Sequence, residues 1–292
     1  MTKKEPKIKI FVSHHKPWYI YEDDIYIPIQ VGKKNAKIDL WIIWDDTGDN
    51  ISDKNSNYAE LTAQYRVWKN YDLSDVDYIW FCHYRRYLDF WITIKFNDIK
   101  NIIHKCQWLY KIICNLFDYV FQFARRKVIY NNKLLWYYSG NTKKYIQKKD
   151  IDIITYRTSI WIRRDNMFHF QLSNKELYSI LEKIITDKYP DYVDSIDETQ
   201  KLRHVNYCNI FIMNKKTFLE YSEWLFTILL EYERVLENKW LIKLWLNEPL
   251  TADTRFFWCL SERLFNIFMT YKKINGARIE KSATLVSLDI QK

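Results

Sequence analysis

The sequence predicts one α/β domain in which helices flank a mixed, largely parallel sheet. In the first 90 residues, short apolar runs end in polar clusters and alternate with a segment of helical spacing. In the second half, long amphipathic stretches predict covering helices. The 292 residues, 48% of them hydrophobic, suffice for a large core without a metal or disulfide. With no internal repeat and no Gly/Ser linker, we expect one domain over 1–292.

The elements follow in chain order. We expect strands at Ile8–Ser13, within the phrase IYIPIQVG, and at Leu40–Trp44, Tyr78–Cys82, Asp150–Ile154 and Asn209–Met213. Apolar spacing predicts helices at Tyr58–Asn70, Glu176–Ile185, Phe218–Leu246 and Phe256–Tyr271. Because polar residues directly follow the early strands, a ligand crevice is expected at the carboxyl edge of the sheet.

Residues 91–145 form an expected helical insertion. Apolar and aromatic residues recur at helical spacing from 99 to 124, followed by Arg125, Arg126 and Lys127. A core helix, a partner-binding helix and a membrane-associating interfacial helix all fit this pattern. The chain has no signal-peptide pattern and no apolar run of about 18 residues. We therefore expect a cytoplasmic protein, with a peripheral position on the inner face of the cell membrane as an open alternative.

The amino-acid composition limits the classes of ligand and partner that we expect. The net charge of +9 favours anionic partners, while only four glycines and no glycine-rich phosphate motif argue for side chains as phosphate ligands. Five widely spaced cysteines indicate reduced thiols, and neither they nor the histidines show a zinc spacing. Nucleic-acid binding is not expected, because the basic residues are dispersed and no recognition motif is present.

The phrase HYRRY, directly after the strand Tyr78–Cys82, is a candidate phosphate site. The forks of Arg85 and Arg86 match phosphate oxygens, and His83 adds a donor. Both arginines can act together only if the chain turns there. The alternative is that they form structural ion pairs with Asp45, Asp46 or Glu60.

Paired carboxylates also follow the strand Leu40–Trp44 and begin the strand Asp150–Ile154. Asp45 and Asp46, in WDDTGDNIS, could bind a divalent metal or ribose hydroxyls, or could serve an Asp-Gly turn. Asp150 and Asp152 spell a DxD, a spacing used for metals by nucleotide-sugar enzymes but common by chance.

Together these motifs resemble a known family. The series SHHKP, DDTGDNIS, KNSNYAELTAQYRVWKN and DYIWFCHYRRYL, and later NIFIMNKKTFLEYSEWLF and RFFWCLSERLFNIF, resembles DUF4422, bacterial glycosyltransferases of capsule and lipopolysaccharide clusters. The resemblance implies a GT-A-like, Rossmann-type fold and a nucleotide-diphospho-sugar donor. The position of the usual metal-binding DxD carries His83, Tyr84 and Arg85, so we expect His83, Arg85 and Arg86 to neutralise the diphosphate. No cofactor is then required, although Mn²⁺ or Mg²⁺ stays open.

The resemblance also suggests roles for individual residues. The expected donor-binding residues are His15, Lys16, Asp45, Asp46, Asn50, Tyr58, Glu60, Thr62, His83, Arg85, Arg86 and Asn209. Tyr58, Glu60 and Thr62 lie where a helix begins, so helix capping is their alternative. The candidates for the catalytic base are Asp46, Asp152 and Glu262, which the sequence does not rank. Glu262 could equally be a structural ion-pair partner of Arg263.

The resulting expectation is a hexosyltransferase. The donor is expected to be UDP-linked, with galactosyl or galactofuranosyl transfer known among relatives, and the acceptor an oligo- or polysaccharide that could be lipid-linked. A non-catalytic sugar- or nucleotide-binding module is the alternative, which turnover would distinguish.

Overall fold

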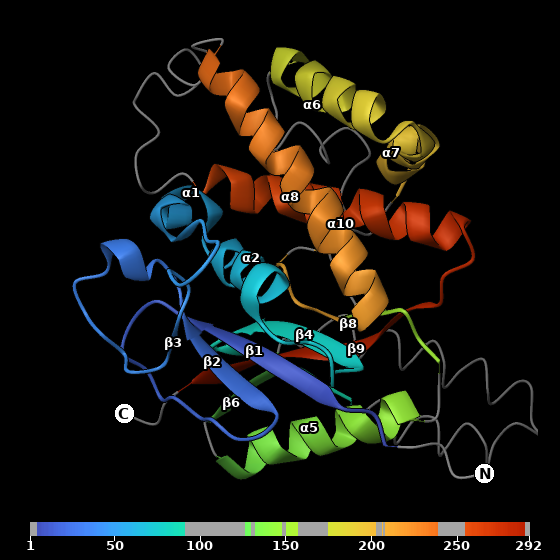
Figure 1. Ribbon diagram of the computed structural model, residues 1–292. Coiled ribbons are helices and arrows are strands. Elements are labelled where there is room, and N and C mark those ends of the chain that lie inside the picture. Colours follow the sequence, from blue (N-terminus) through green and yellow to red (C-terminus); the bar gives the residue numbers. More distant parts are fainter. Residues whose placement is uncertain are drawn as a thin grey trace, which may run out of the picture.

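The computed structural model describes residues 5–90, 126–129, 132–147, 150–156, 175–202, 206, 208–238 and 255–289. These ranges form three layers, with a central sheet between one helix on one face and a group of helices on the other (Figure 1). The mixed α/β architecture expected from the sequence is confirmed.

Nine strands form the described sheet, in the order β3–β2–β1–β4–β5–β9–β7–β8, with β6 added at β9. The strands are β1 (Ile8–His14), β2 (Tyr26–Gln30), β3 (Ile43–Trp44), β4 (Tyr78–His83), β5 (Arg86–Asp89), β6 (Arg126–Ile129), β7 (Ile153–Tyr156), β8 (Phe211–Asn214) and β9 (Ile279–Asp289). The first four run parallel, whereas β5 and β8 run antiparallel to β4. The parallel half is therefore the Rossmann-type part of a mixed sheet.

Successive side chains along each strand point to opposite faces of the sheet, so the hydrophobic core consists of two clusters, one on each face. Phe11 of β1 and Phe81 of β4 face the larger helical layer, while Ile10 and Trp80 face the opposite side. This follows from the period of two in a strand, which sends successive side chains to opposite faces. Both faces are apolar because both are covered, as parallel sheets require.

The larger layer contains α1 (Asn55–Tyr58), α2 (Leu61–Asn70), α6 (Lys175–Lys188), α7 (Val193–Gln200), α8 (Lys215–Asn238) and α10 (Phe256–Ile274). Only α5 (Asn132–Gln147) is seen on the other face among the described helices (Figure 1). The single helix expected at Tyr58–Asn70 is instead two, because Ala59 has φ 47° and interrupts it. The strand expected at Leu40–Trp44 is shorter, because the chain pairs with β2 only at Ile43 and Trp44.

The outer edge of β4 has two different neighbours. Residues Tyr78 to Phe81 pair with β8, whereas His83 pairs with Arg86 at the start of β5. Cys82 lies between these pairings, where the ladder changes partner. This change of partner opens the sheet edge at the carboxyl end of β4.

Most of the expected insertion lies outside the described residues, since 91–125 are not described. The helical stripe predicted for 99–127 therefore stays a prediction, except that Arg126 and Lys127 belong to strand β6 rather than to a helix. None of the helices in the described ranges combines the length and apolarity of a transmembrane span.

Candidate functional site

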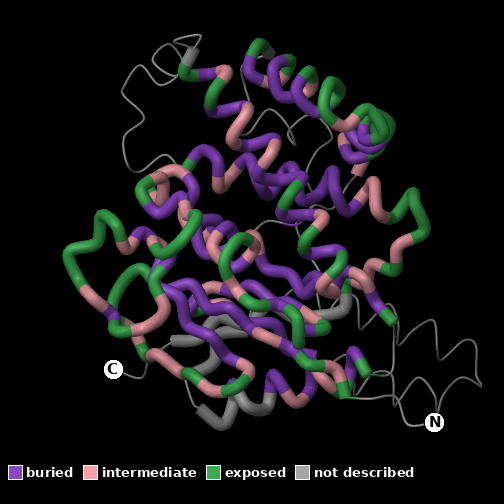
Figure 2. Tube along the Cα trace, viewed as in Figure 1, coloured by how far each residue is buried: buried purple, intermediate pink, exposed green. Residues whose placement is uncertain are grey.

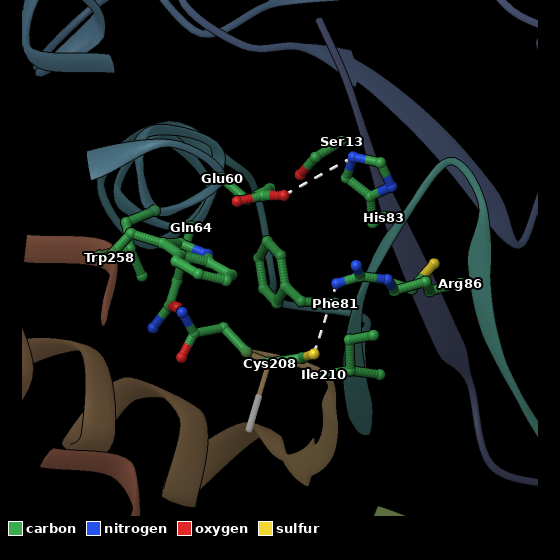
Figure 3. A pocket seen from close by; sticks show the side chains of 12 residues that line it. Ser13, Glu60, Gln64, Phe81, His83, Arg86, Cys208, Ile210 and Trp258 are labelled. Carbon is green, nitrogen blue, oxygen red and sulfur yellow. Dashed lines mark hydrogen bonds and ion pairs between the residues drawn. The ribbon is translucent and has the colours of Figure 1, made fainter. Parts of the chain in front are cut away.

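A pocket opens at the carboxyl edge of the sheet, where β4 changes partner. It encloses about 380 Å³, counting the space open to solvent at its mouth. Its walls come from the ends of β1 and β4, the start of β5, helices α2 and α10, and the segment before β8. The lining residues are Ser13, Glu60, Leu61, Gln64, Phe81, Cys82, His83, Arg86, Cys208, Asn209, Ile210 and Trp258 (Figure 3).

The HYRRY phrase forms a tight hairpin beside this pocket. Tyr84 and Arg85 make the two-residue turn, so His83 and Arg86 face each other across the strands. Arg86 lines the pocket, and its Nη1 donates to Cys208 Sγ at 3.4 Å. Arg85 is exposed at the tip, with its guanidinium 5.1 Å from the ring of Tyr84 and 5.9 Å from that of Trp18. The turn required for both arginines to act at one site is therefore present.

The two arginines do not form the structural ion pairs considered as their alternative. Within the described ranges, no carboxylate oxygen lies within 4.0 Å of a nitrogen of Arg85 or Arg86. Arg86 thus lines an open pocket, and Arg85 lies at the exposed turn next to it, with no carboxylate oxygen of a described residue within 4.0 Å of either guanidinium. Such an arrangement suits an anionic ligand, because guanidinium forks bind phosphate oxygens in a bidentate manner.

The imidazole of His83 does not share this positive charge. Burial, followed by the charge of Arg86, lowers the pKa of His83 to about 2, so the ring is neutral at working pH. The expectation that His83 acts as a cation is therefore corrected. The neutral ring can still form a hydrogen bond with a ligand. The ring of His15 lies 5.8 Å from that of His83, at the rim, and burial also lowers the pKa of His15.

Glu60 places a carboxylate in the pocket wall, just before α2 begins. Its Oε1 lies 3.6 Å from Nε2 of His83 (Figure 3), while its Oε2 is enclosed and has no hydrogen-bond partner among the residues that the structure describes. Burial raises the pKa of Glu60, an effect that the nearby Arg255 and Arg86 oppose. A carboxylate that is poorly solvated and faces a pocket is a candidate proton acceptor.

Glu262 lies behind this wall, on α10, and is only 3% exposed. Its Oε1 accepts the backbone N–H of Cys208 at 2.6 Å, and Cys208 has φ 71°. The carboxylate therefore fixes a left-handed residue that, with Asn209, forms part of the pocket wall. Burial raises the pKa of Glu262 to about 7, and the neighbouring Glu60 adds to the rise.

This raised pKa predicts a pH-dependent effect of Glu262→Gln on stability. The folded protein keeps the Glu262 proton up to about pH 7, whereas the unfolded chain releases it near 4.5. Stability contributed by the protonated carboxyl is therefore lost as the pH rises from 4.5 to 7. Urea titrations should show the free energy of unfolding of the glutamine variant, relative to wild type, rising by about 2 kcal/mol between pH 5 and pH 8. A difference that is constant with pH would contradict this assignment.

Asp45 serves the fold rather than a ligand, which corrects its expected role. It is fully buried, and its carboxylate accepts the N–H groups of Gly32 at 2.7 Å and Lys33 at 3.0 Å. The hydroxyl of Ser52 donates to it at 2.5 Å. The carboxylate thus joins the loops that follow β2 and β3, and no free side is left for ribose or metal.

Asp45→Ala should accordingly lower the free energy of unfolding by about 3–5 kcal/mol, because two buried donors and one half-buried donor lose their acceptor. The exposed neighbour Asp53 is a matched control, for which alanine should change stability by no more than about 0.5 kcal/mol. Urea unfolding of both variants measures the difference. If both variants lower the free energy of unfolding by the same small amount, the loops keep their structure without the Asp45 carboxylate.

Other expected donor ligands also have structural partners. The amide of Asn50 donates to the carbonyls of Asp46 and Gly48 within the turn, and the hydroxyl of Thr62 donates to the carbonyl of Ala59. The buried Tyr58 donates to Glu233 at 3.1 Å, from a position outside the pocket. These contacts correct the roles expected for Asn50, Tyr58 and Thr62.

The remaining candidates differ in position. Asp152 lies at the opposite edge of the sheet, where it accepts from Asn214 at 2.7 Å and from the N–H of Arg278 at 2.9 Å, so its expected role as catalytic base is corrected. Asp46 does not line the pocket, although its Oδ1 is enclosed and accepts no hydrogen bond from any described residue. Lys16 is exposed beyond the end of β1. Asn209 lines the pocket as expected, and its Nδ2 donates to Ser261 Oγ at 2.8 Å.

The described residues contain no group of three or more His, Cys, Asp or Glu side chains suited to a metal ion. Of the carboxylates expected to hold Mn²⁺ or Mg²⁺, Asp45 is engaged by three donors and Asp152 lies at the opposite edge of the sheet, so these two do not fit that task.

Several pocket residues were missed by sequence reasoning. Gln64 follows Glu60 by four residues, and Trp258 precedes Glu262 by four, so helical spacing could have placed each with its partner on one face. Ser13 pairs with His83 in the register of β1 and β4, a contact that only the sheet order reveals.

The fold as a whole is GT-A-like, a class in which a Rossmann-type sheet is extended by mixed strands. A similar solved structure is that of WbbM, a bifunctional glycosyltransferase in its apo form, with a TM-score of 0.72 and 25% identity. The match covers 97% of this chain and 45% of that one, so this chain spans less than half the length of WbbM. The chain belongs to the DUF4422 family, described as a domain of unknown function, which matches residues 9–273. No curated protein sequence matches it.

Proposed function

We propose that this chain is a glycosyltransferase that moves a hexosyl unit from a nucleotide-diphospho-sugar to an oligo- or polysaccharide acceptor. The likeness to part of WbbM, itself a bifunctional glycosyltransferase, supports the class of reaction. UDP-linked galactose and galactofuranose are the first donors to test, because the family resemblance favours them.

The observation that carries the proposal is the pair of arginines beside the pocket. Arg86 lines the open pocket and Arg85 lies at the exposed turn beside it, and neither forms an ion pair with a carboxylate within the described ranges. A diphosphate leaving group gains negative charge as it departs, and fixed cations in a partly enclosed site stabilise that charge. The arginines are thus proposed to hold the diphosphate, with neutral His83 able to donate one hydrogen bond.

Glu60 is proposed as the catalytic base in place of the candidates named from the sequence. It lines the pocket, whereas Asp152 lies at the far edge and Glu262 uses one oxygen to hold Cys208. In the proposed step Glu60 takes the proton of the acceptor hydroxyl as its oxygen attacks the anomeric carbon. The bond from that carbon to the diphosphate breaks, and its electron pair leaves with the nucleotide. A single displacement of this kind inverts the anomeric configuration.

A thermal-shift screen tests the proposal. UDP, GDP, CMP and their sugar conjugates are each added with Mn²⁺ or with EDTA, and a ligand at about a hundred times its Kd stabilises by about 2.7 kcal/mol. A shift with one diphosphate nucleotide that survives EDTA is the expected result. A shift that needs Mn²⁺ would move the diphosphate to a metal site, and no shift at all would leave a sugar-binding module as the better proposal.

A further inference from the structure

The loop from Lys33 to Trp41, which joins β2 to β3, carries unusually exposed apolar side chains. Trp41 is 86% exposed and Ile38 is 53% exposed. Figure 2 shows how exposed, intermediate and buried residues are distributed along the chain. Tryptophan is large and mostly apolar, so such exposure of a single side chain at a loop tip calls for an explanation.

This exposure does not come from a loosely held loop. The buried side chain of Gln30 holds it from beneath, since its Nε2 donates to the carbonyl of Ile38 at 2.7 Å and its Oε1 accepts the N–H of Leu40 at 2.9 Å. Asp39 accepts the N–H of Trp41 at 2.8 Å. The backbone that leads to Trp41 is therefore held in place, while the Trp41 side chain is exposed.

Trp41 is also held in an unfavourable backbone conformation. Its φ is 57°, in the left-handed region that bulky side chains avoid and that Asn or Gly adopts readily. A strained and exposed side chain that its surroundings fix in place is a mark of a functional position.

Three lysines, Lys33, Lys34 and Lys37, precede Trp41 in the same loop. Lys33 pairs with Asp39 at 3.0 Å, whereas Lys34 and Lys37 are exposed and form no ion pair with any residue that the structure describes. The exposed Asp53, whose carbonyl accepts from Asn35, is the nearby opposing charge. Over 33–41 the three lysines and one aspartate leave a formal charge of +2. Tryptophan at the interface with lysines around it is the pattern of proteins that bind anionic lipid surfaces.

We propose that the 33–41 loop is a membrane-docking element that places Trp41 and Ile38 among the headgroups of an anionic phospholipid bilayer. Lys34 and Lys37 contact the lipid phosphates. The loop follows the carboxyl end of β2, and the pocket lies at the carboxyl ends of β1 and β4, so docking holds the pocket edge near the membrane. This is where a lipid-linked sugar acceptor would be met, a consequence that rests on the proposed function. The docking itself does not.

Vesicle flotation of the full chain tests the docking. Phosphatidylcholine vesicles with and without about one third phosphatidylglycerol are compared at low and high salt. Trp41→Asn should lower the partition coefficient on anionic vesicles at least about tenfold, because the apolar contact is lost. Lys34→Ala should lower it by about fivefold. Since asparagine tolerates a left-handed conformation, Trp41→Asn should retain or raise Tm.

Ile274→Ser is the matched control. Ile274 is 57% exposed at the end of α10 and has Lys272 and Lys273 before it, yet it lies on another part of the surface. It should bind vesicles as wild type does. Equal partitioning of wild type and Trp41→Asn would overturn the proposal, as would an equal loss in Ile274→Ser. Nucleotide-induced thermal shifts, measured in parallel, should be unchanged in Trp41→Asn. If they disappear instead, the loop belongs to the donor site and the docking proposal is wrong.

Discussion

Glu60→Gln is expected to slow sugar transfer by about 10²- to 10⁴-fold, the usual effect of removing a general base. Glutamine keeps the size of the side chain but cannot take the acceptor proton. Nucleotide binding should change little, because the diphosphate contacts are assigned to the arginines. Steady-state kinetics should therefore show the loss in kcat, while thermal shifts with the nucleotide persist. In the wild type, the rate should fall on the acid side, as Glu60 is protonated at its raised pKa.

Two other carboxylates supply the controls for this prediction. Asp152→Asn should leave kcat within about twofold, because Asp152 lies at the opposite edge of the sheet. Glu262→Gln should alter the pH dependence of stability and have little effect on kcat. The reason is that Glu262 accepts the N–H of Cys208 behind the pocket wall and does not itself line the pocket. If Glu60→Gln retains full turnover while one of these two abolishes it, the base has been misassigned. The transferase assignment itself would survive that result.

Arg86→Ala should weaken nucleotide-diphosphate binding by about 10- to 150-fold, corresponding to about 1.5–3 kcal/mol for a charge-assisted contact. Arg86 is half-buried beside the pocket, so its charge is less screened than that of Arg85 at the exposed tip. Arg86→Lys should retain part of the affinity, because it keeps the charge and loses the bidentate fork. Calorimetric titration with the nucleotide that gives the largest thermal shift measures all three proteins.

An exposed arginine at the far edge of the sheet serves as the control. Arg278 lies beside Asp150, so Arg278→Ala removes the same charge from the net total without touching the pocket. It should bind nucleotide as wild type does. If Arg86→Ala and Arg278→Ala weaken binding equally, general attraction by the basic protein explains the affinity. If Arg86→Ala lowers only Tm, its contact with Cys208 is structural.

The sequence predicts the layers better than the ends of the elements. Strands such as β1 and β4 are recognisable because both of their faces are apolar, and helices such as α10 because their apolar spacing is regular. The break at Ala59, where φ is 47°, could not be predicted from the sequence, because alanine is the strongest helix former. Likewise, the apolar run Leu40–Trp44 hides a loop that Gln30 holds from a neighbouring strand.

The site is predictable where a motif directly follows a strand. His83, Arg85 and Arg86 meet at the pocket edge because the polar cluster ends β4 at the carboxyl edge of the sheet. Asp45 and Asp46 follow a strand in the same way. The carboxylate of Asp45, however, accepts hydrogen bonds from backbone N–H groups, and the spacing of residues in the sequence does not reveal these contacts. The charge state of His83 depends on burial beside Arg86, which is a property of the folded chain alone.

The position of β9 has a consequence for the order of folding. The hairpin that carries Arg86 is anchored through β5 to β9, in a pairing that joins Tyr87 to Val286 across about two thirds of the chain. Such a distant pairing forms slowly, because the loop it closes is long. During synthesis from the amino terminus, β1, β2 and β4 can associate well before Ile279–Asp289 has emerged, whereas β5 cannot gain its outer neighbour until then. The arginine pair should therefore acquire its fixed geometry late, when the last strand docks.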